Sequence, residues 1–268
     1  LLAEDEAIVA VGMAVPGPYL KDLGRTAVVS SMQGWRRVNF PEEFGSAFRV
    51  PVFVEQDARA GALAQYLFDP GNASDNLAYY LIGEGIGLGI IEQGRIIDGS
   101  RGVATEIGHV SIDLDGRPCD CGNVGCLERY CAAPAIHEMV VGAGDLIENA
   151  SSLTHAQACR ALFAKANGGD ERARGIVRAA ARYLAFGCVT IINMFNPERI
   201  IIGDIGADAG PLLLDEIQRV VDRHVIPELN EATTISLSEL PSDAALGGAA
   251  AVAIVQFLEH PSMFFDLG

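Results

Sequence analysis

Three cysteines and one histidine near the middle of the chain constrain its fold more than any other feature, because together they can close a metal site. Cys119, Cys121 and Cys126 follow the spacing Cys-x-Cys-x4-Cys, and His109 lies ten positions before the first of them. Thiolate sulfur and imidazole nitrogen are donors that Zn2+ prefers, and four of them complete its tetrahedron. The segment therefore predicts a structural zinc site. The alternative is three buried free thiols and a histidine of the core.

The bulk composition predicts an ordinary folded protein of the cytoplasm. The chain has 268 residues, of which 50% are hydrophobic and 20% charged, values typical of globular proteins. No apolar run reaches the roughly eighteen residues of a membrane span, and no basic region precedes an apolar stretch at the amino end, so we expect no membrane partner. The three other cysteines, Cys131, Cys159 and Cys188, lie in helix-like sequence, which favours reduced thiols.

The charge balance argues against direct contact with nucleic acid. The formal net charge is −16 at pH 7, which repels a phosphate backbone over most of the surface. We therefore expect DNA contacts to require residues outside this sequence.

Strand-like and helix-like segments alternate along the chain, which predicts an α/β architecture. A helix is expected over residues 58–68 with Asp57 at its N-cap, and the longest helix over residues 170–195. Further helices are expected from residue 134 onward, over 212–225 and over 246–258, and strands over 7–15, 52–55, 77–82, 85–91, 95–97, 199–202 and 235–237.

Two of these strands deliver possible ligand-binding segments to their carboxyl ends, where open α/β sheets bind ligands. Gln56 and Asp57 follow one strand, and a buried aspartate there can accept a proton from a substrate hydroxyl as a general base. A helix N-cap is the alternative role for Asp57. Gly83, Gly85 and Gly87 follow the other strand and can leave backbone N–H groups free for an anion such as phosphate. A glycine-rich turn without a ligand is the alternative there.

Two carboxylates flank the metal motif, and another lies within the glycine segment. Glu106 lies three residues before His109, and Glu128 lies two residues after Cys126. A zinc ion would hold both glutamates rigidly, which suits the recognition of several sugar hydroxyls, and a zinc-bound histidine keeps its second N–H as a donor. Solvated surface glutamates are the alternative. The carboxylate of Glu84, within the glycine segment, repels a bound polyphosphate unless Mg2+ or a basic residue lies between them.

Taken together, these segments resemble the ROK family, which contains bacterial sugar kinases and sugar-responsive transcriptional repressors. The resemblance covers nearly the whole chain, and the Glu-x-Gly-His and cysteine segments are its most specific part. It also includes residues 11–18, Gly34-Trp35, residues 52–57, Gly203 and residues 247–249. The resemblance implies an actin-like, ribonuclease H-like α/β fold with two lobes and a cleft between them.

The same resemblance implies a division of the chain and a set of site residues. We expect residues 1–51 to form the remainder of the small N-terminal lobe, with a helix at about 246–268 packing back on it, and residues 52–245 to form the large lobe with a zinc loop at 106–128. The implied zinc ligands are His109, Cys119, Cys121 and Cys126, the implied sugar-binding residues are Gln56, Asp57, Glu106, His109 and Glu128, and Ser31 aligns with a further sugar contact.

Departures from the kinase pattern favour the repressor branch of the family. Glu84 stands where the kinases offer a threonine, and Gly203 is followed by Asp204 instead of a second glycine. The first phosphate loop of the kinases is also absent from the sequence. We therefore expect the effector-binding and dimerisation region of a sugar-responsive regulator, which binds a sugar without phosphorylating it and contacts DNA through an N-terminal winged helix outside this sequence.

Two other functions remain open on the sequence. The main alternative is an ATP- and Mg2+-dependent kinase of a hexose or N-acetylhexosamine, with Asp57 as general base and the glycine segment holding phosphate. A stand-alone sugar-binding or partner-binding module without catalysis is the other. Structural zinc is expected under all three.

Overall fold

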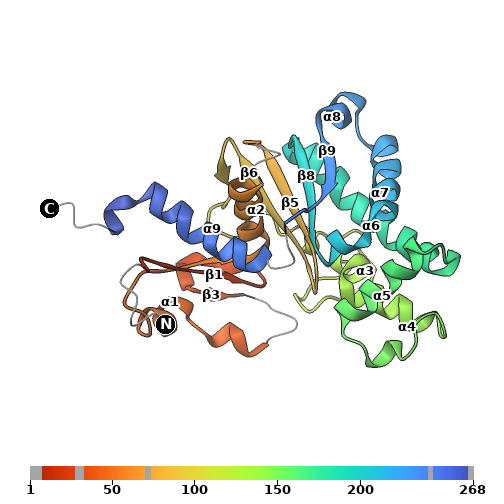
Figure 1. Cartoon of the computed structure of the whole chain (residues 1–268), viewed down its shortest axis with the longest axis horizontal. Helices are drawn as coiled ribbons and strands as arrows, with labels where there is room; N and C mark the ends of the chain where they lie inside the picture. The colour runs from red at the N-terminus through yellow and green to blue at the C-terminus, as the bar shows by residue number, and fades with distance from the viewer. Residues whose placement is uncertain (1–7, 28–32, 70–73, 241–243, 265–268) are drawn as a thin grey trace.

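The computed structural model of the protein describes residues 8–27, 33–69, 74–240 and 244–264 (Figure 1). Its strands are β1 (Val11–Val15), β2 (Tyr19–Leu20), β3 (Arg25–Thr26), β4 (Val52–Gln56), β5 (Leu77–Ile82), β6 (Ile86–Glu92), β7 (Arg95–Ile96), β8 (Arg199–Asp204) and β9 (Thr234–Leu237). Its helices are α1 (Phe40–Gly45), α2 (Asp57–Phe68), α3 (Glu128–Cys131), α4 (Ala133–Gly142), α5 (His155–Asn167), α6 (Glu171–Phe195), α7 (Pro211–His224), α8 (Pro227–Ala232) and α9 (Ala244–Glu259). The predicted α/β architecture is confirmed.

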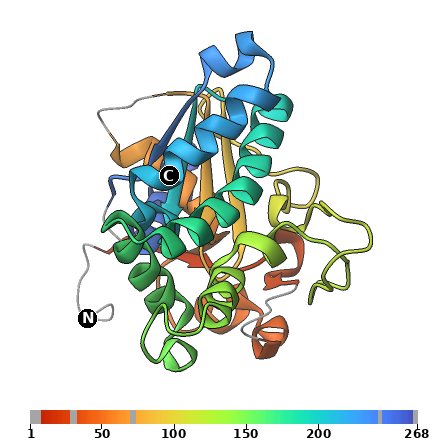
Figure 2. The same ribbon diagram turned by 90° about the vertical axis from the view of Figure 1, so that its right-hand side faces the viewer.

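A five-stranded mixed sheet forms the centre of the molecule. Its strand order is β7-β6-β5-β8-β9, with β5, β8 and β9 parallel and β6 and β7 antiparallel to their neighbours. Side chains alternate between the two faces of a strand, so Tyr79 and Tyr80 of β5 belong to different cores. Tyr80 packs with α4 to α7, and Tyr79 packs with α2 and α9. Helices therefore cover both faces of the sheet, as Figures 1 and 2 show.

A smaller sheet lies beside this centre and is formed by β1 and β4, which are parallel and pair in register from Val11 with Val52 to Val15 with Gln56. Helix α9 packs on β1, β4 and α2, and Gly12 allows that approach because a Cβ there would collide with the carbonyl of Ala249. Strand β4 thus belongs to the smaller sheet together with β1, although the predicted boundary between the lobes lies before Val52. The division of the chain into domains stays a prediction.

Helix α6 is the one helix among the described residues that is long and apolar enough to cross a membrane by length and composition. Half of its most apolar window is buried inside the protein. Its buried face includes Val177, Leu184 and Ile191 and contributes to the core on one side of the sheet. The core helix of an α/β protein accounts for these features.

Candidate functional site

A cavity of about 460 Å3 opens where the carboxyl ends of β1, β4, β5 and β8 meet. The loop after β1, the start of α2, the β5–β6 turn and the residues around the cysteine segment contribute to its wall. Its polar lining residues are Gln56, Asp57, Glu84, Glu106, His109, Asp120, Glu128, Arg129, His155 and Asp204. All five residues predicted to bind sugar are therefore brought to one cavity.

Gln56 and Asp57 enter the cavity at the junction of β4 and α2. The prediction that Asp57 caps this helix is wrong, because the extended backbone continues through Gln56, whose side-chain oxygen accepts the N–H of Arg59 at 3.1 Å. Asp57 is the first helical residue, and its Oδ1 accepts the N–H of Ala58 at 2.7 Å. Burial raises the pKa of Asp57 to about 7, against the effect of that hydrogen bond, and the carboxylate of Asp204 raises it further.

Glu106 lies at the start of a short 3-10 turn, Ile107–His109, which also carries the histidine of the metal motif. Burial raises the pKa of Glu106 to about 7, although the guanidinium of Arg59 acts in the opposite direction. Thr105, just before it, has a φ of 68°, which is unusual for a β-branched residue. Its hydroxyl donates to the carbonyl of Leu88 at 2.6 Å and so ties this strained segment to β6.

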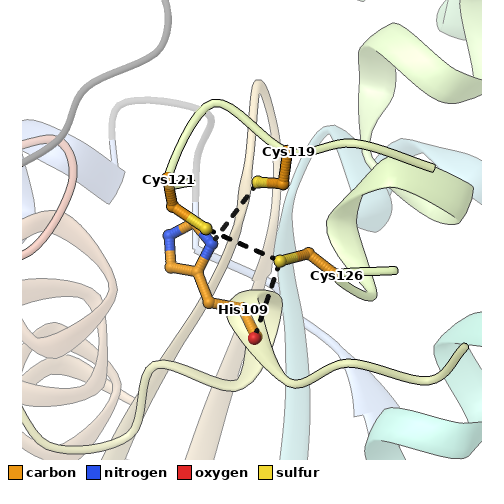
Figure 3. Close-up of side chains that lie close together, drawn as sticks. All are labelled: His109, Cys119, Cys121 and Cys126. Atoms are coloured by element: carbon orange, nitrogen blue, oxygen red, sulfur yellow. Dashed lines mark hydrogen bonds between the residues drawn. The ribbon is translucent and has the colours of Figure 1, made fainter. Parts of the chain in front are cut away.

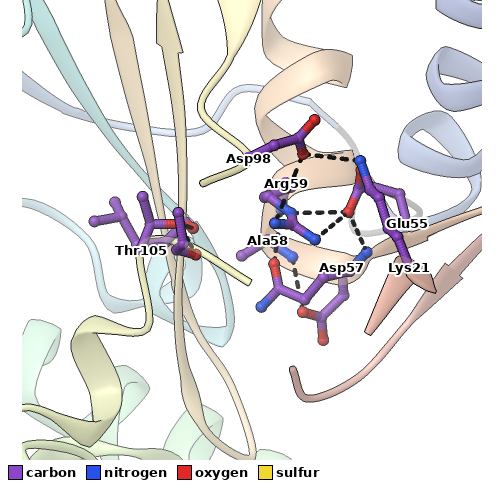
Figure 4. A network of polar contacts seen from close by, with 10 residues as sticks. Lys21, Glu55, Asp57, Ala58, Arg59, Asp98 and Thr105 are labelled. Carbon is purple, nitrogen blue, oxygen red and sulfur yellow. Dashed lines mark hydrogen bonds and ion pairs between the residues drawn. The ribbon is translucent and has the colours of Figure 1, made fainter. Parts of the chain in front are cut away.

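Behind the cavity, a network of four charged side chains joins segments that are distant in sequence (Figure 4). Arg59 of α2 donates through Nε to Oε1 of Glu55 at 2.8 Å, and its Nη2 lies 2.6 Å from the same oxygen. Lys21 contacts Glu55 Oε2 and Asp98 Oδ1, both at 2.8 Å. The charges of the two positive and two negative side chains thus cancel, and Arg59 and Glu55 are almost fully buried.

The predicted metal ligands converge beside the cavity (Figure 3). One donor atom from each of His109, Cys119, Cys121 and Cys126 lies within 4.8 Å of the other three. The sulfurs of Cys121 and Cys126 are 3.6 Å apart, and that of Cys119 is 3.9 Å from Nδ1 of His109. Zinc–sulfur bonds of about 2.3 Å in a tetrahedron place sulfurs about 3.8 Å apart, so these residues fit a zinc ion. The cluster could hold a metal.

Glu128 connects the metal cluster to the cavity. Its Oε1 lies 3.1 Å from the Cys119 sulfur and 3.5 Å from Nδ1 of His109. Its other oxygen, Oε2, approaches Gly85, where a Cβ would lie 3.3 Å away. These contacts place one carboxylate oxygen of Glu128 at the metal cluster and the other toward the β5–β6 turn, in the wall of the cavity.

One backbone N–H group of the glycine segment is not free to bind an anion. The predicted free N–H of Gly83 is engaged, because it donates to the carbonyl of Gly85 at 3.0 Å and closes the β5–β6 turn. Gly87 lies in β6, where a Cβ would come within 2.7 Å of the Cβ of Ala58, so its small size allows α2 to pack on the sheet. A phosphate site at this segment stays a prediction.

Two acidic side chains occupy the same end of the cavity. Asp204 is the last residue of β8 and has φ 57° and ψ −138°, a backbone region that is almost exclusive to glycine. One of its carboxylate oxygens points at Gly83, close enough that a Cβ on that glycine would collide with it. Glu84, at the tip of the turn, pairs with Nδ1 of His155 at 2.8 Å.

Four of the polar lining residues lay outside the prediction. These are Asp120, Arg129, His155 and Asp204 as a wall residue. The sequence carried a signal only for Asp204, because it replaces an expected glycine. Ser31, the further predicted sugar contact, lies outside the described residues.

The layered sheet and the cleft at its strand ends define an α/β protein with the actin-like fold of sugar kinases. The chain belongs to the ROK family, whose family model matches residues 2–256. The family resemblance seen in the sequence is thus confirmed.

Relatives of both branches of the family are similar to this chain. The xylose repressor of Bacillus spizizenii is 31% identical over 262 residues, which cover 96% of this chain and 64% of the repressor. The crystal structure of a ROK family transcriptional regulator homologous to the E. coli Mlc protein superposes with a TM-score of 0.80 at 29% identity, over 95% of this chain and 64% of that one. The structure of a ROK family glucokinase from Streptomyces griseus, in complex with glucose and AMPPNP, superposes with a TM-score of 0.79 at 28% identity. The superposition covers 94% of this chain and 83% of the glucokinase. The chain spans less than two thirds of the length of the two regulators.

Proposed function

We propose that this chain is the effector-binding and dimerisation region of a sugar-responsive ROK transcriptional regulator, and that it binds a sugar or sugar derivative without phosphorylating it. Similarity alone does not separate the two branches, because the regulator and the glucokinase superpose almost equally well. The residues of the cleft therefore carry the proposal.

The main support comes from the carboxylates of Glu84 and Asp204 at the end of the cleft where a kinase would hold its nucleotide. Two like charges about 4 Å apart repel by about 4 kcal/mol at an effective dielectric constant of about 20. Solvent reduces this value for Glu84, whose side chain is 53% exposed. Solvent reduces it for Asp204 as well, because this residue is exposed at the end of β8, and partial desolvation raises the pKa of its carboxyl. Both groups oppose a polyphosphate.

The other end of the cleft supports sugar binding. Asp57, Glu106 and Glu128 offer carboxylate oxygens that accept hydrogen bonds from hydroxyl groups. A zinc ion bound by the cysteine segment would supply folding free energy to that loop. His109 would then ligate through one ring nitrogen and keep the other N–H as a donor toward the cavity.

Regulation requires that the sugar bind one arrangement of the two lobes more tightly than another. Such a change would alter two ion pairs that join segments distant in sequence. Lys21 pairs with Asp98 and Asp22 pairs with Arg101, at 2.8 and 2.7 Å, and both pairs join the β2–β3 hairpin to the segment after β7. In the proposed regulator, a homodimer would transmit this change to winged helices that precede the present sequence.

Calorimetric titration of the complete native protein with xylose and with glucose tests the proposal. We expect saturable binding of at least one sugar without ATP. Glu106→Gln should weaken that binding at least tenfold, because a charge-assisted hydrogen bond of about 1.5–3 kcal/mol is lost. Glu138→Gln, at an exposed ion pair with Arg117, is the matched control and should retain full affinity. Absence of binding by both monosaccharides and by their disaccharides contradicts the proposal.

An ATP-dependent sugar kinase is the second candidate, and one observation favours it. The pKa of Asp57, about 7, suits a general base at neutral pH. Phosphorylation of glucose that requires Mg-ATP and is abolished by Asp57→Asn would establish this candidate in place of the regulator.

A further inference from the structure

The cavity continues beyond the residues proposed to bind sugar. Glu84, Arg129 and His155 also line it, and we call these three residues the outer group. The side chains of Glu84 and His155 are 53% and 41% exposed, so this group lies at the rim of the cavity. The whole cavity, about 460 Å3, falls in the range of about 300–1,000 Å3 of pockets for drug-sized ligands. A single hexose is only about half such a ligand in heavy atoms.

Arg129 is the member of the outer group that most needs a ligand. Within the described ranges its guanidinium makes no ion pair, whereas Arg117 next to it pairs with Glu138. Its Nε is enclosed by the protein without a hydrogen-bond partner, so a ligand in the cavity would reach its two terminal nitrogens. Its backbone is fixed in α3, and its carbonyl accepts Nη1 of Arg117 at 2.9 Å. A guanidinium is always charged and carries only donors, so an unpaired one at a cavity wall is suited to bind acceptor oxygens of a ligand.

The chemistry of the rest of the cavity narrows the source of those oxygens. Six carboxylates line it, those of Asp57, Glu84, Glu106, Asp120, Glu128 and Asp204. They disfavour a phosphate or another anion. A neutral sugar unit can bind both the guanidinium and the carboxylates of the cavity. Each of its hydroxyl groups can accept a hydrogen bond from Arg129 and donate one to a carboxylate such as Glu84.

We propose that the outer group is a second sugar subsite, so that the effector is an unphosphorylated saccharide of at least two units. Its first unit binds among the residues around Asp57 and Glu106. The hydroxyl groups of its second unit accept hydrogen bonds from Arg129 and donate hydrogen bonds to Glu84. This inference rests on the proposed function and specifies the ligand class of the same cleft.

The test compares disaccharides with their own monosaccharides on the complete native protein. Xylose, xylobiose, glucose, cellobiose, maltose and glucose 6-phosphate are titrated by calorimetry. At least one disaccharide should bind ten times more tightly than its monosaccharide, and glucose 6-phosphate should bind more weakly than glucose. Arg129→Met and Glu84→Gln should each reduce the ratio of disaccharide to monosaccharide affinity about tenfold.

The controls separate this inference from the function on which it rests. Arg182→Met makes the same substitution on α6, at a different cavity, and should leave the ratio unchanged. Thermal unfolding verifies that each variant is folded. Equal affinity for disaccharides and monosaccharides, or tighter binding of glucose 6-phosphate, overturns the second subsite and leaves the proposed function standing. If Arg129→Met reduces the affinities for the disaccharide and for its monosaccharide by the same factor, the second subsite is also overturned. If none of the sugars binds, the proposed function fails and the second subsite fails with it.

Discussion

The backbone of Asp204 predicts a measurable strain beside the cavity. Its φ of 57° and ψ of −138° fall in a region that costs a side-chain-bearing residue about 1–3 kcal/mol. Glycine avoids this cost but loses about 0.5–1 kcal/mol of chain entropy relative to alanine. The variants Asp204→Gly and Asp204→Ala both lack the carboxylate, so the difference between them equals the strain less the entropy cost of glycine. Asp204→Gly should be the more stable by about 1 kcal/mol.

Urea and thermal unfolding of the two variants measure this difference. For a chain of this size, about 1 kcal/mol corresponds to a melting temperature about 2–4 °C higher for the glycine variant. The comparison of Asp204→Ala with the native protein then reports the contribution of the carboxylate itself. An alanine variant more stable than the glycine variant by about 0.5–1 kcal/mol would refute the reasoning, because that is the entropy difference alone and leaves no strain.

Three other predictions follow from the site. Cys121→Ser should release the bound metal and weaken sugar binding, because the loop loses the folding free energy of its ligand set; full sugar affinity in verified metal-free protein contradicts this. A sugar hydroxyl that donates to Asp57 stabilises its ionised form and lowers its pKa from about 7, so affinity should rise with pH, about fivefold between pH 6 and pH 8 for a fall of about one unit. Calorimetry at pH 6 and pH 8 measures this change, and a sugar affinity that decreases as the pH rises would contradict the prediction. Glu55→Gln should destabilise the fold by about 3 kcal/mol, because it leaves Arg59 buried with less compensation, whereas Asp98→Asn, at a side chain 42% exposed, should cost much less in urea unfolding.

The main elements of the fold could be predicted because their patterns are local. Strand β5 was predicted at its observed bounds, and α6 to within one residue, from buried β-rich sequence and from helical periodicity. The two-residue strands β2 and β3 and the short helix α1 were not predicted. Such short elements form through contacts such as Tyr19 against Phe40, which a local pattern does not contain.

The candidate site shows the same division between local and distant information. The metal ligands and their neighbouring glutamates could be predicted because they are close in sequence. The pairing of Glu84 with His155, 71 positions apart, depends on how α5 packs near the β5–β6 turn. The packing of Gly87 against α2 could not be predicted, because it is visible only once that helix is placed on the sheet.

The most direct test of the central claim is to add Mg-ATP to the complete native protein saturated with the sugar it binds, and to quantify ADP and sugar phosphate. The carboxylates of Glu84 and Asp204 predict that sugar binds with the same affinity with and without the nucleotide and that neither product forms. Sugar phosphate formed in proportion to ADP, and lost in Asp57→Asn, would contradict the account and identify a kinase.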